Sequence, residues 1–352
     1  MRVLLLGGTG AMGVHLSSIL SSMDFFVDVT SRSYHADMGK IHYIQGDAKN
    51  LSFLENVLKH SYDAIIDFMQ YSTEEFKERV NILLKNTVQY FFFSSARVYA
   101  NSKYDLSETS GRLLDNCKDQ QYLSTDEYAL SKARQEDILL GCGKYNWTII
   151  RPYITYSCDR LQLGVLEKEN WLYRALNHHT IVFSKDIAEK TTTMTYGYDT
   201  ARIISLLISN KAALGKIIQI AGRDSKKWSD VLNLYLDVIY QKTGFKPSVI
   251  YVDRTSDSST LNRYQIDYDR MYNRKFNSDF ADEICGVKYE YTPMLIGLRK
   301  CLTEFLDGPM KFREISWHYE AWADKVSHEN TPLLNIPSLQ NKTKYLLFRY
   351  FL

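Results

Sequence analysis

The chain carries almost no net charge. Its 43 lysines and arginines nearly balance 41 aspartates and glutamates, which leaves a formal net charge of +2 over 352 residues. A protein that holds nucleic acid or an anionic membrane by electrostatics presents a strong positive field. The composition gives no indication of such a field, so we expect no nucleic-acid partner.

Long apolar runs and metal-binding cysteine spacings are also missing. The opening run covers only Val3 to Leu6, far short of the roughly 20 residues that span a bilayer, and we expect no membrane insertion. The five cysteines show no CxxC pair, and MRVLLLGG does not resemble a signal peptide. We therefore expect reduced thiols in a cytoplasmic protein. No third metal ligand accompanies His178 and His179, so we interpret them as loop residues and expect no metal site.

Short apolar runs alternate with helical stretches over the first 150 residues. The strand candidates are Val3–Leu6, Phe26–Thr30, His42–Ile44, Ala64–Phe68, Tyr90–Phe93 and Trp147–Ile150. The helix candidates are Ala11–Ser22, Leu51–His60, Glu74–Lys85 and Glu127–Leu140. Such alternation is typical of an α/β fold with a doubly wound parallel sheet covered by helices on both faces.

The alternation loosens after about residue 152. Helices are predicted at Thr200–Ser209, Ser229–Thr243 and Met294–Leu306, and short strands at Ile181–Phe183, Ile217–Ile220 and Ser248–Tyr251. We interpret residues 1–151 as one domain, 152–307 mainly as a smaller lobe with some segments returning to the sheet, and 308–352 as a C-terminal tail. The tail ends YLLFRYFL, and this aromatic end is expected to pack on a subunit rather than enter a membrane.

A glycine-rich turn, LGGTGAMG, links the first strand to the first helix. Gly7 permits the tight turn, Gly10 lets the backbone approach a pyrophosphate, and Gly13 lets the helix pack on the strand. The helix N-terminus supplies N–H groups and positive partial charge for phosphates. This context predicts a dinucleotide site of the Rossmann type, the alternative being a plain strand–helix turn.

Two positions bear on which dinucleotide is bound. NAD-preferring proteins usually end the second strand with an acidic residue, whereas here Ser31 and Arg32 follow Thr30. Arginine can pair with a 2′-phosphate, which favours NADP over NAD; alternatively Arg32 stacks on the adenine or points to solvent. Asp47, after the third strand, is expected at the adenine amino group, or else serves as a helix cap or turn residue.

A tyrosine and a lysine form the catalytic candidate. Tyr128 and Lys132 are i and i+4 on one predicted helix and therefore share a face. Free tyrosine, with a pKa of about 10, is a poor base at neutral pH, and a nearby ammonium favours the phenolate. Ser95 ends the fifth strand, at the edge where ligands bind in such folds, and can polarise an alcohol or carbonyl. The alternative is a surface pair beside a strand-end serine.

Taken together, these motifs resemble the extended short-chain dehydrogenase/reductase family, in particular its NAD-dependent epimerase/dehydratase branch. The similarity rests on LGGTGAMG, GDAKN, SSARVYA, YALSK, IIRPYITYS and YTPMLIGLRKCL, and runs over residues 1–306. It implies a Rossmann domain with a smaller C-terminal substrate-binding lobe, and catalytic roles for Ser95, Tyr128 and Lys132. The implied cofactor-binding residues are Gly7, Gly10, Ala11, Met12, Gly13, Ser31, Arg32, Asp47, Ala48, Phe68, Tyr128, Lys132 and Tyr153. The implied substrate-binding residues are Ser95, Arg97, Ile154 and Arg274.

The activity that this resemblance implies is epimerisation of a nucleotide sugar by transient oxidation of a hydroxyl with NAD(P). An NADPH-dependent reductase of a keto-sugar nucleotide or related ketone is the alternative. Arg32 favours it, and so does Leu6, which replaces the threonine usual before the first glycine, as in atypical, reductase-like members of the family. A non-catalytic, RNA-associated or regulatory member is a further alternative, against which the Ser–Tyr–Lys set and the low charge argue. Ala96-Arg97 replace the Asp-Glu pair of dehydratases, and Ile154 replaces an asparagine common in epimerases.

The resemblance also implies a homodimer in which two helices of each subunit form a four-helix contact. Apolar residues occur at helical spacing on both predicted helices. They are Phe76, Val80, Leu83, Leu84, Ile138 and Leu139. The same residues could instead face the sheet within one chain.

Overall fold

The computed structural model describes residues 1–351, and the chain divides into two compact units. The first unit contains Met1–Ser157, Thr193–Asp224 and Lys275–Pro293, and the second contains Cys158–Thr192, Ser225–Arg274 and Met294–Leu352. Two later segments of the chain thus return to the N-terminal unit.

A seven-stranded parallel sheet forms the centre of the first unit. Its order is β11-β6-β5-β4-β1-β2-β3. The strands are β1 (Arg2–Leu6), β2 (Phe26–Ser31), β3 (Ile41–Gln45), β4 (Tyr62–Asp67), β5 (Thr87–Phe93), β6 (Trp147–Pro152) and β11 (Lys216–Ile220). The chain order reverses between β1 and β4, and ligands of doubly wound sheets bind at the carboxyl ends of strands at such a switch point. The predicted fold class is confirmed.

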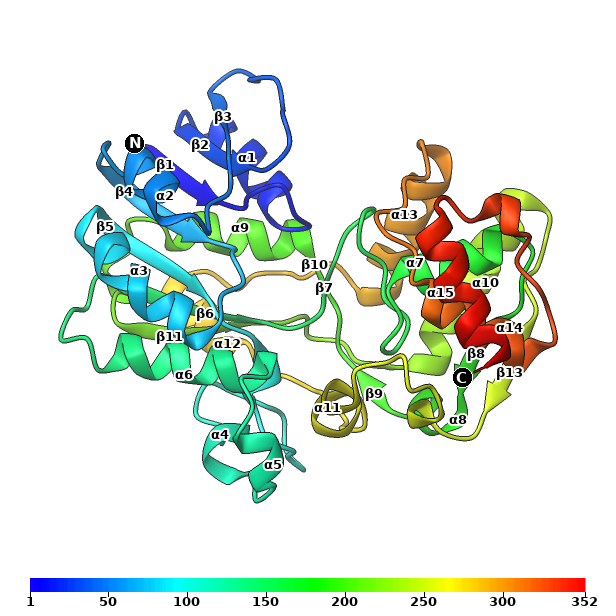
Figure 1. Ribbon diagram of the computed structural model, residues 1–352. Coiled ribbons are helices and arrows are strands. Elements are labelled where there is room, and N and C mark those ends of the chain that lie inside the picture. The colour runs from blue at the N-terminus through cyan, green and yellow to red at the C-terminus, as the bar shows by residue number, and fades with distance from the viewer. Residues whose placement is uncertain (352) are drawn as a thin grey trace. The chain divides into compact units, whose positions relative to one another are not determined.

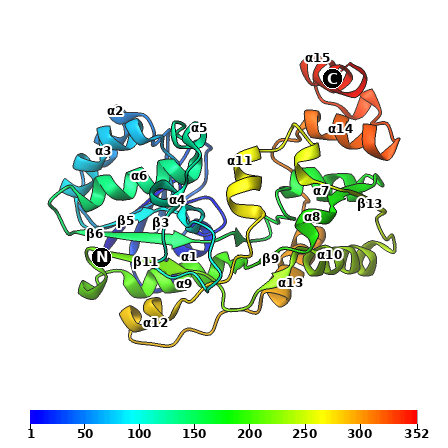
Figure 2. The same cartoon turned by 90° about the horizontal axis from the view of Figure 1, so that it is seen from below.

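Helices cover both faces of this sheet (Figures 1 and 2). One face carries α2 (Leu51–Val57), α3 (Thr73–Lys85) and α6 (Tyr128–Leu140), and the other carries α1 (Gly13–Ser22), α9 (Gly197–Leu207) and α12 (Asp279–Cys285). Shorter pieces are η1 (Ala96–Val98), α4 (Leu113–Asn116), α5 (Gln120–Leu123) and η2 (Lys211–Ala213). The strands read as apolar runs because both of their faces are buried: Val3 to Leu6 are each 0% exposed.

Two elements expected in the smaller lobe belong to the first unit. The predicted helix Thr200–Ser209 is α9, which packs on α1, and the predicted strand Ile217–Ile220 is β11, which pairs with β6 at the sheet edge. A parallel pair of β7 (Thr155–Tyr156) and β10 (Thr195–Tyr196) extends the same unit.

The apolar residues proposed for a four-helix dimer contact lie inside one subunit. Phe76, Val80, Leu83, Leu84 and Leu139 are buried in the core cluster beneath α3 and α6, and Ile138 packs against it. The outward residues of α3, all described, are polar: Glu74, Lys77, Glu78, Asn81 and Lys85. These stripes therefore cover the sheet, and α3 has no second apolar stripe to offer a partner.

The second unit is mainly helical. Its helices and turns are α7 (Lys168–Leu176), α8 (Lys185–Ala188), α10 (Trp228–Thr243), η3 (Thr255–Asp257), α11 (Arg263–Gln265), η4 (Ile266–Arg270), α13 (Met294–Asp307), α14 (Trp317–Ser327), η5 (Leu333–Asn335) and α15 (Leu339–Tyr350). β8 (Ile181–Ser184) pairs in parallel with β13 (Val249–Val252), and β9 (Thr191–Thr192) pairs antiparallel with β12 (Lys226–Lys227).

The C-terminal tail forms a helical pair within the second unit. α14 and α15 pack through Trp317, Ala321, Ile336 and Tyr345. Over residues 1–351, no helix combines the length and the hydropathy that crossing a bilayer requires.

Candidate active site

The three glycines of the first turn have distinct surroundings. Gly7 has a φ of +67°, which favours glycine, and its N–H donates to Thr30 Oγ1 at 2.9 Å. A Cβ on Gly13 would lie 2.3 Å from the Gly8 carbonyl oxygen, whereas a Cβ on Gly10 would meet nothing within 4 Å. Gly7 thus makes the turn, Gly13 permits close packing, and Gly10 faces open space.

The N-terminus of α1 follows directly after the glycine turn. Met12 occupies the cap position without a side-chain cap, and the first turn holds no acidic residue. Such an end is suited to an anion. Ala11 and Met12 are half-buried beside it, and the backbone of Gly197, at the start of α9, approaches the Ala11 carbonyl closely, since a Cβ there would lie 2.2 Å from that oxygen.

The ends of β2 and β3 place Arg32 and Asp47 at the surface. Arg32 is exposed, and its guanidinium has no polar partner within residues 1–351, while the Ser31 hydroxyl accepts the Ser33 N–H at 3.2 Å. Asp47 is exposed and accepts the Lys49 N–H at 3.0 Å. It is therefore a turn residue in this structure, whereas Asn50 is the residue that caps α2.

The side chains of Ala48 and Phe68 are packed against other residues of the first unit, which limits their contact with a cofactor. Ala48 is 3% exposed and belongs to the core beneath α2. Phe68 is half-buried and packs on Phe93, with ring centroids 4.5 Å apart. Contact by Ala48 would have to come from its backbone.

Tyr128 is the first residue of α6 and is only half-buried. Its hydroxyl has no hydrogen-bond partner in the described part of the chain, so it is available to a ligand. The Glu127 carboxylate caps the helix by accepting the Ala129 N–H at 2.8 Å. Arg97 donates to Glu127 at 2.7 Å and lies 5.1 Å from the centroid of the Tyr128 ring. The arginine that replaces the acidic residue of dehydratases thus lies against the candidate acid–base residue.

The two serines after β5 have different roles. Ser94 is 2% exposed and donates to the Glu136 carboxylate at 2.5 Å. Ser95 Oγ accepts the Arg97 N–H at 3.2 Å, which leaves its own hydroxyl hydrogen for a ligand. The Ser95 hydroxyl can therefore still donate to a ligand, as predicted from the sequence, whereas the Ser94 hydroxyl is used within the fold.

Lys132 lies one turn beyond Tyr128 and is 2% exposed. Its Nζ donates to the Met69 carbonyl at 3.5 Å and lies 4.7 Å from the centroid of the Phe92 ring. Burial lowers the pKa of Lys132 to about 8, and this fall is opposed by the negative charge of Asp67. A Cβ on Gly7 would lie 2.7 Å from Met69 Sδ, so Met69 contacts both the lysine and the glycine turn.

A buried ion pair, missed from the sequence, holds α6 on the sheet. Glu136 is 0% exposed and receives two bonds from Arg151 of β6, at 2.8 and 2.7 Å. Glu136 lies four residues after Lys132 and eight after Tyr128, on the same helical face. That spacing was a usable signal, but its arginine partner is distant in sequence.

Tyr153 and Ile154 follow β6 and are buried. Tyr153 is 1% exposed and packs on Phe276. Ile154, 8% exposed, has a φ of +28°, a region that a β-branched residue rarely adopts and that asparagine tolerates better. The substitution of isoleucine at this position therefore carries backbone strain.

The other predicted substrate residue, Arg274, lies in the second unit. It is 1% exposed, and its Nε donates to Asp269 at 3.0 Å, while its backbone N–H donates to Thr191. Arg274 is thus part of the packing of that unit, and its role toward a substrate stays a prediction.

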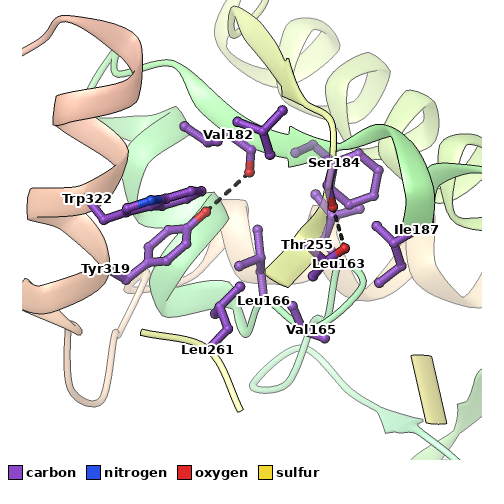
Figure 3. A pocket seen from close by; sticks show the side chains of 12 residues that line it. Leu163, Val165, Leu166, Val182, Ser184, Ile187, Thr255, Leu261, Tyr319 and Trp322 are labelled. Atoms are coloured by element: carbon purple, nitrogen blue, oxygen red, sulfur yellow. Dashed lines mark hydrogen bonds between the residues drawn. The ribbon is translucent and has the colours of Figure 1, made fainter. Parts of the chain in front are cut away.

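The second unit also holds a small apolar pocket (Figure 3). Tyr319 and Trp322 of α14 border it, and the Tyr319 hydroxyl donates to the Val182 carbonyl at 3.2 Å. The hydroxyls of Ser184 and Thr255 bond to each other at 2.6 Å on another side. The cavity volume is about 20 Å³, room for about one water molecule, and no charged residue lines it. It does not suit a sugar diphosphate.

His179 has the neighbours that the sequence did not reveal. Ligand atoms of His179, Asp324 and Glu329 lie within 4.8 Å of one another, so two carboxylates that are distant in the sequence accompany one of the two histidines. The Arg174 guanidinium, however, binds the same two carboxylates at 2.8 and 3.0 Å. We interpret the cluster as an ion-pair network, and the absence of a metal stays a prediction.

Comparison with known proteins supports the fold. No family model matches the chain. A curated relative, the chloroplast stem-loop binding protein of 41 kDa b of Arabidopsis thaliana, is 25% identical over 238 residues, an alignment that covers 63% of this chain and 58% of the relative. The chain thus matches less than two thirds of that protein's length.

Solved structures of epimerases are similar over most of the chain. The epimerase Mth375 of Methanothermobacter thermautotrophicus has a TM-score of 0.68 at 17% identity, covering 87% of this chain and 93% of its own. The UDP-glucuronic acid 4-epimerase of Bacillus cereus, in complex with NAD, has a TM-score of 0.65 at 13% identity, covering 87% and 96%. At these identities the similarity shows the fold, and the resemblance found in the sequence is confirmed at that level.

Proposed function

We propose that the chain is an NAD(P)-dependent epimerase of a nucleotide sugar, belonging to the extended short-chain dehydrogenase/reductase family. The observation that carries the proposal is the contact of Met69 with both the glycine turn and the buried Lys132 ammonium. One helical turn before Lys132, the Tyr128 hydroxyl has no hydrogen-bond partner among the described residues. The solved NAD complex of a similar fold supports the choice of cofactor class.

The residues present fit a bound dinucleotide. Gly10 and the uncapped start of α1 would hold the pyrophosphate, Arg32 or Asp47 the adenosine end, and Lys132 the ribose near the reacting carbon. When bound, the nicotinamide supplies a place to accept and return a hydride. We propose NADP over NAD because Arg32 is exposed, its guanidinium has no polar partner within residues 1–351, and no acidic residue accompanies it at the end of β2.

Side chains of the protein would transfer the proton of the sugar hydroxyl. Tyr128 takes the proton from the sugar hydroxyl and later returns it, while Ser95 donates a hydrogen bond to the same oxygen. The Lys132 ammonium stabilises negative charge that develops on this face of α6. Arg97, whose guanidinium lies 5.1 Å from the centroid of the Tyr128 ring, would contact the substrate beside Tyr128.

A turnover assay tests this proposal. The enzyme is incubated with a panel of nucleotide sugars that includes UDP-glucuronic acid, the ligand of a structurally similar epimerase, and the products are followed by proton NMR. Epimerisation without consumption of added cofactor supports the proposal, and Tyr128→Phe is the inactive control. Stoichiometric loss of NADPH with a ketone substrate would instead support the reductase, which the exposed Arg32 favours.

Two further candidates concern partners and assembly. The name of the Arabidopsis relative makes stem-loop RNA a second candidate ligand, although a net charge of +2 does not favour it. A filter-binding assay with a stem-loop RNA tests this candidate.

A homodimer and a cytoplasmic location stay predictions. Light scattering should give twice the chain mass of 41.0 kDa if a surface other than the buried stripes of α3 and α6 makes the contact.

A further inference from the structure

Asp67 closes β4 beside the switch point of the sheet and is 1% exposed. Its carboxylate accepts bonds from the Tyr90 hydroxyl at 2.8 Å, the Met69 N–H at 2.9 Å and the Tyr71 hydroxyl at 3.4 Å. No cation within residues 1–351 lies within ion-pair distance of it. A carboxylate without an adjacent cation is costly to bury, so its presence at this position calls for a function.

Met69 connects this carboxylate to Lys132. Its N–H is bound by Asp67 at 2.9 Å, and its carbonyl accepts the Lys132 ammonium at 3.5 Å. Its side chain lies against the glycine turn, where Gly7 leaves room for it. The carboxylate therefore fixes the backbone segment that in turn holds the lysine.

Three charged groups from separate parts of the chain act on Lys132. They are Asp67 of β4, Glu136 of α6 and Lys49 before α2, while the hydroxyls of Tyr90 and Tyr71 bind the Asp67 carboxylate. Glu136 is already bound by Arg151 through two hydrogen bonds, and the positive charge of Lys49 acts against that of Lys132. Asp67 is the carboxylate left to balance the lysine.

We propose that Asp67 is a positioning residue for Lys132: it holds Met69 in place and supplies the counter-charge that keeps the buried ammonium protonated and aimed at the cofactor site. The assignment of a cofactor there rests on the proposed function. Burial raises the pKa of Asp67 to about 6, so the group is still ionised at neutral pH, where its charge acts.

The ionisation of Lys132 can be followed without cofactor or turnover. In protein labelled with ¹³Cε-lysine, the Lys132 signal is assigned by its absence in Lys132→Met and titrated from pH 6 to 10. The wild-type midpoint should lie near 8, and Asp67→Asn should lower it by about one pH unit. Asp63→Asn removes a half-buried acid from the same strand and should leave the midpoint unchanged. Equal midpoints in wild type and Asp67→Asn would overturn the proposal.

A double-mutant cycle separates positioning from a general effect on folding. A midpoint one unit lower cuts the charged fraction of Lys132 at pH 8 from about one half to one tenth, so Asp67→Asn should weaken NADP(H) binding about fivefold. In a Lys132→Met background the same change should have less than about a twofold effect. Equal losses in both backgrounds would overturn the proposal.

Folding and cofactor binding are judged separately. Asp67→Ala replaces Asp67→Asn if the asparagine variant does not fold, and failure of both would overturn the proposal because the carboxylate would then serve the fold itself. If the wild type binds neither NAD nor NADP, the proposed function fails, while the NMR midpoints still report on Asp67.

Discussion

Replacing Gly13 by alanine should destabilise the first unit through a steric clash and not through backbone strain, because Gly13 has no positive φ. The added Cβ would lie 2.3 Å from the Gly8 oxygen and 2.6 and 2.7 Å from two further backbone atoms of Gly8. These atoms belong to the turn that joins β1 to α1, so they cannot rotate away as a side chain could. Relief requires α1 to move away from the sheet that it covers.

The cost can be worked out from this contact. Overpacking in a close-packed interior costs about 1–3 kcal/mol, and a contact with backbone on one side belongs at the upper end. Replacing glycine by alanine in a helix returns at most about 1 kcal/mol. We expect a net loss of about 2 kcal/mol, which lowers Tm by about 4–8 °C in a domain of 150–250 residues.

Gly10→Ala is the matched control because its Cβ would meet nothing within 4 Å. Thermal unfolding followed by circular dichroism should show Gly10→Ala at the wild-type Tm and Gly13→Ala clearly below it. Titration with NADP(H) should show weaker binding by Gly10→Ala than by the wild type, because the added methyl group fills the open side of the turn. A Tm for Gly13→Ala within 1 °C of wild type, or unimpaired binding by Gly10→Ala, would refute the reasoning.

Three further variants test the site and the tail. Tyr128→Phe should lower turnover about 10²–10⁴-fold with cofactor affinity nearly intact; activity within a few-fold of wild type removes Tyr128 from the mechanism. Arg32→Ala should weaken NADP(H) by about 1.5–3 kcal/mol and NAD(H) much less, and equal losses in a binding titration return Arg32 to a solvent role. Burial raises the pKa of Glu320 to about 8, even though Arg174 donates to its carboxylate at 2.9 Å, so below that pH the folded state keeps a proton that the unfolded chain loses above about pH 4.5. The stability from this group therefore falls by up to about 1.4 kcal/mol per pH unit and is gone above pH 8. Glu320→Gln should abolish that slope in urea unfolding followed by tryptophan fluorescence, and an unchanged slope contradicts the assignment.

Local patterns in the sequence were enough to predict the sheet and the motifs on it. Buried parallel strands are continuous apolar runs, and the glycine turn and the Tyr128–Lys132 pair are each contained within a few residues. For the same reason the position of Ser95 after β5 was predictable. These features depend only on residues that are close together in the chain, so they can be recognised in a single sequence.

The partners of these groups depend on contacts between distant segments. The sequence analysis did not single out Asp67, which lies inside the predicted strand Ala64–Phe68, because its connection to Lys132 passes through Met69, 63 residues before the lysine. Nothing local indicated that Arg151 would bind Glu136. The apolar stripes of α3 and α6 were compatible with both a dimer contact and the core of one chain. Helical spacing alone does not show whether a stripe packs on the sheet of its own chain or on a second subunit.

Identification of the bound cofactor tests the central claim most directly. Protein purified without added nucleotide is denatured, and the released small molecules are separated and identified together with their redox state. An epimerase that retains its hydride acceptor should release NADP or NAD in an amount approaching one per chain. A preparation that releases neither, and that binds neither NAD(H) nor NADP(H) when they are added at millimolar concentration, would contradict the account.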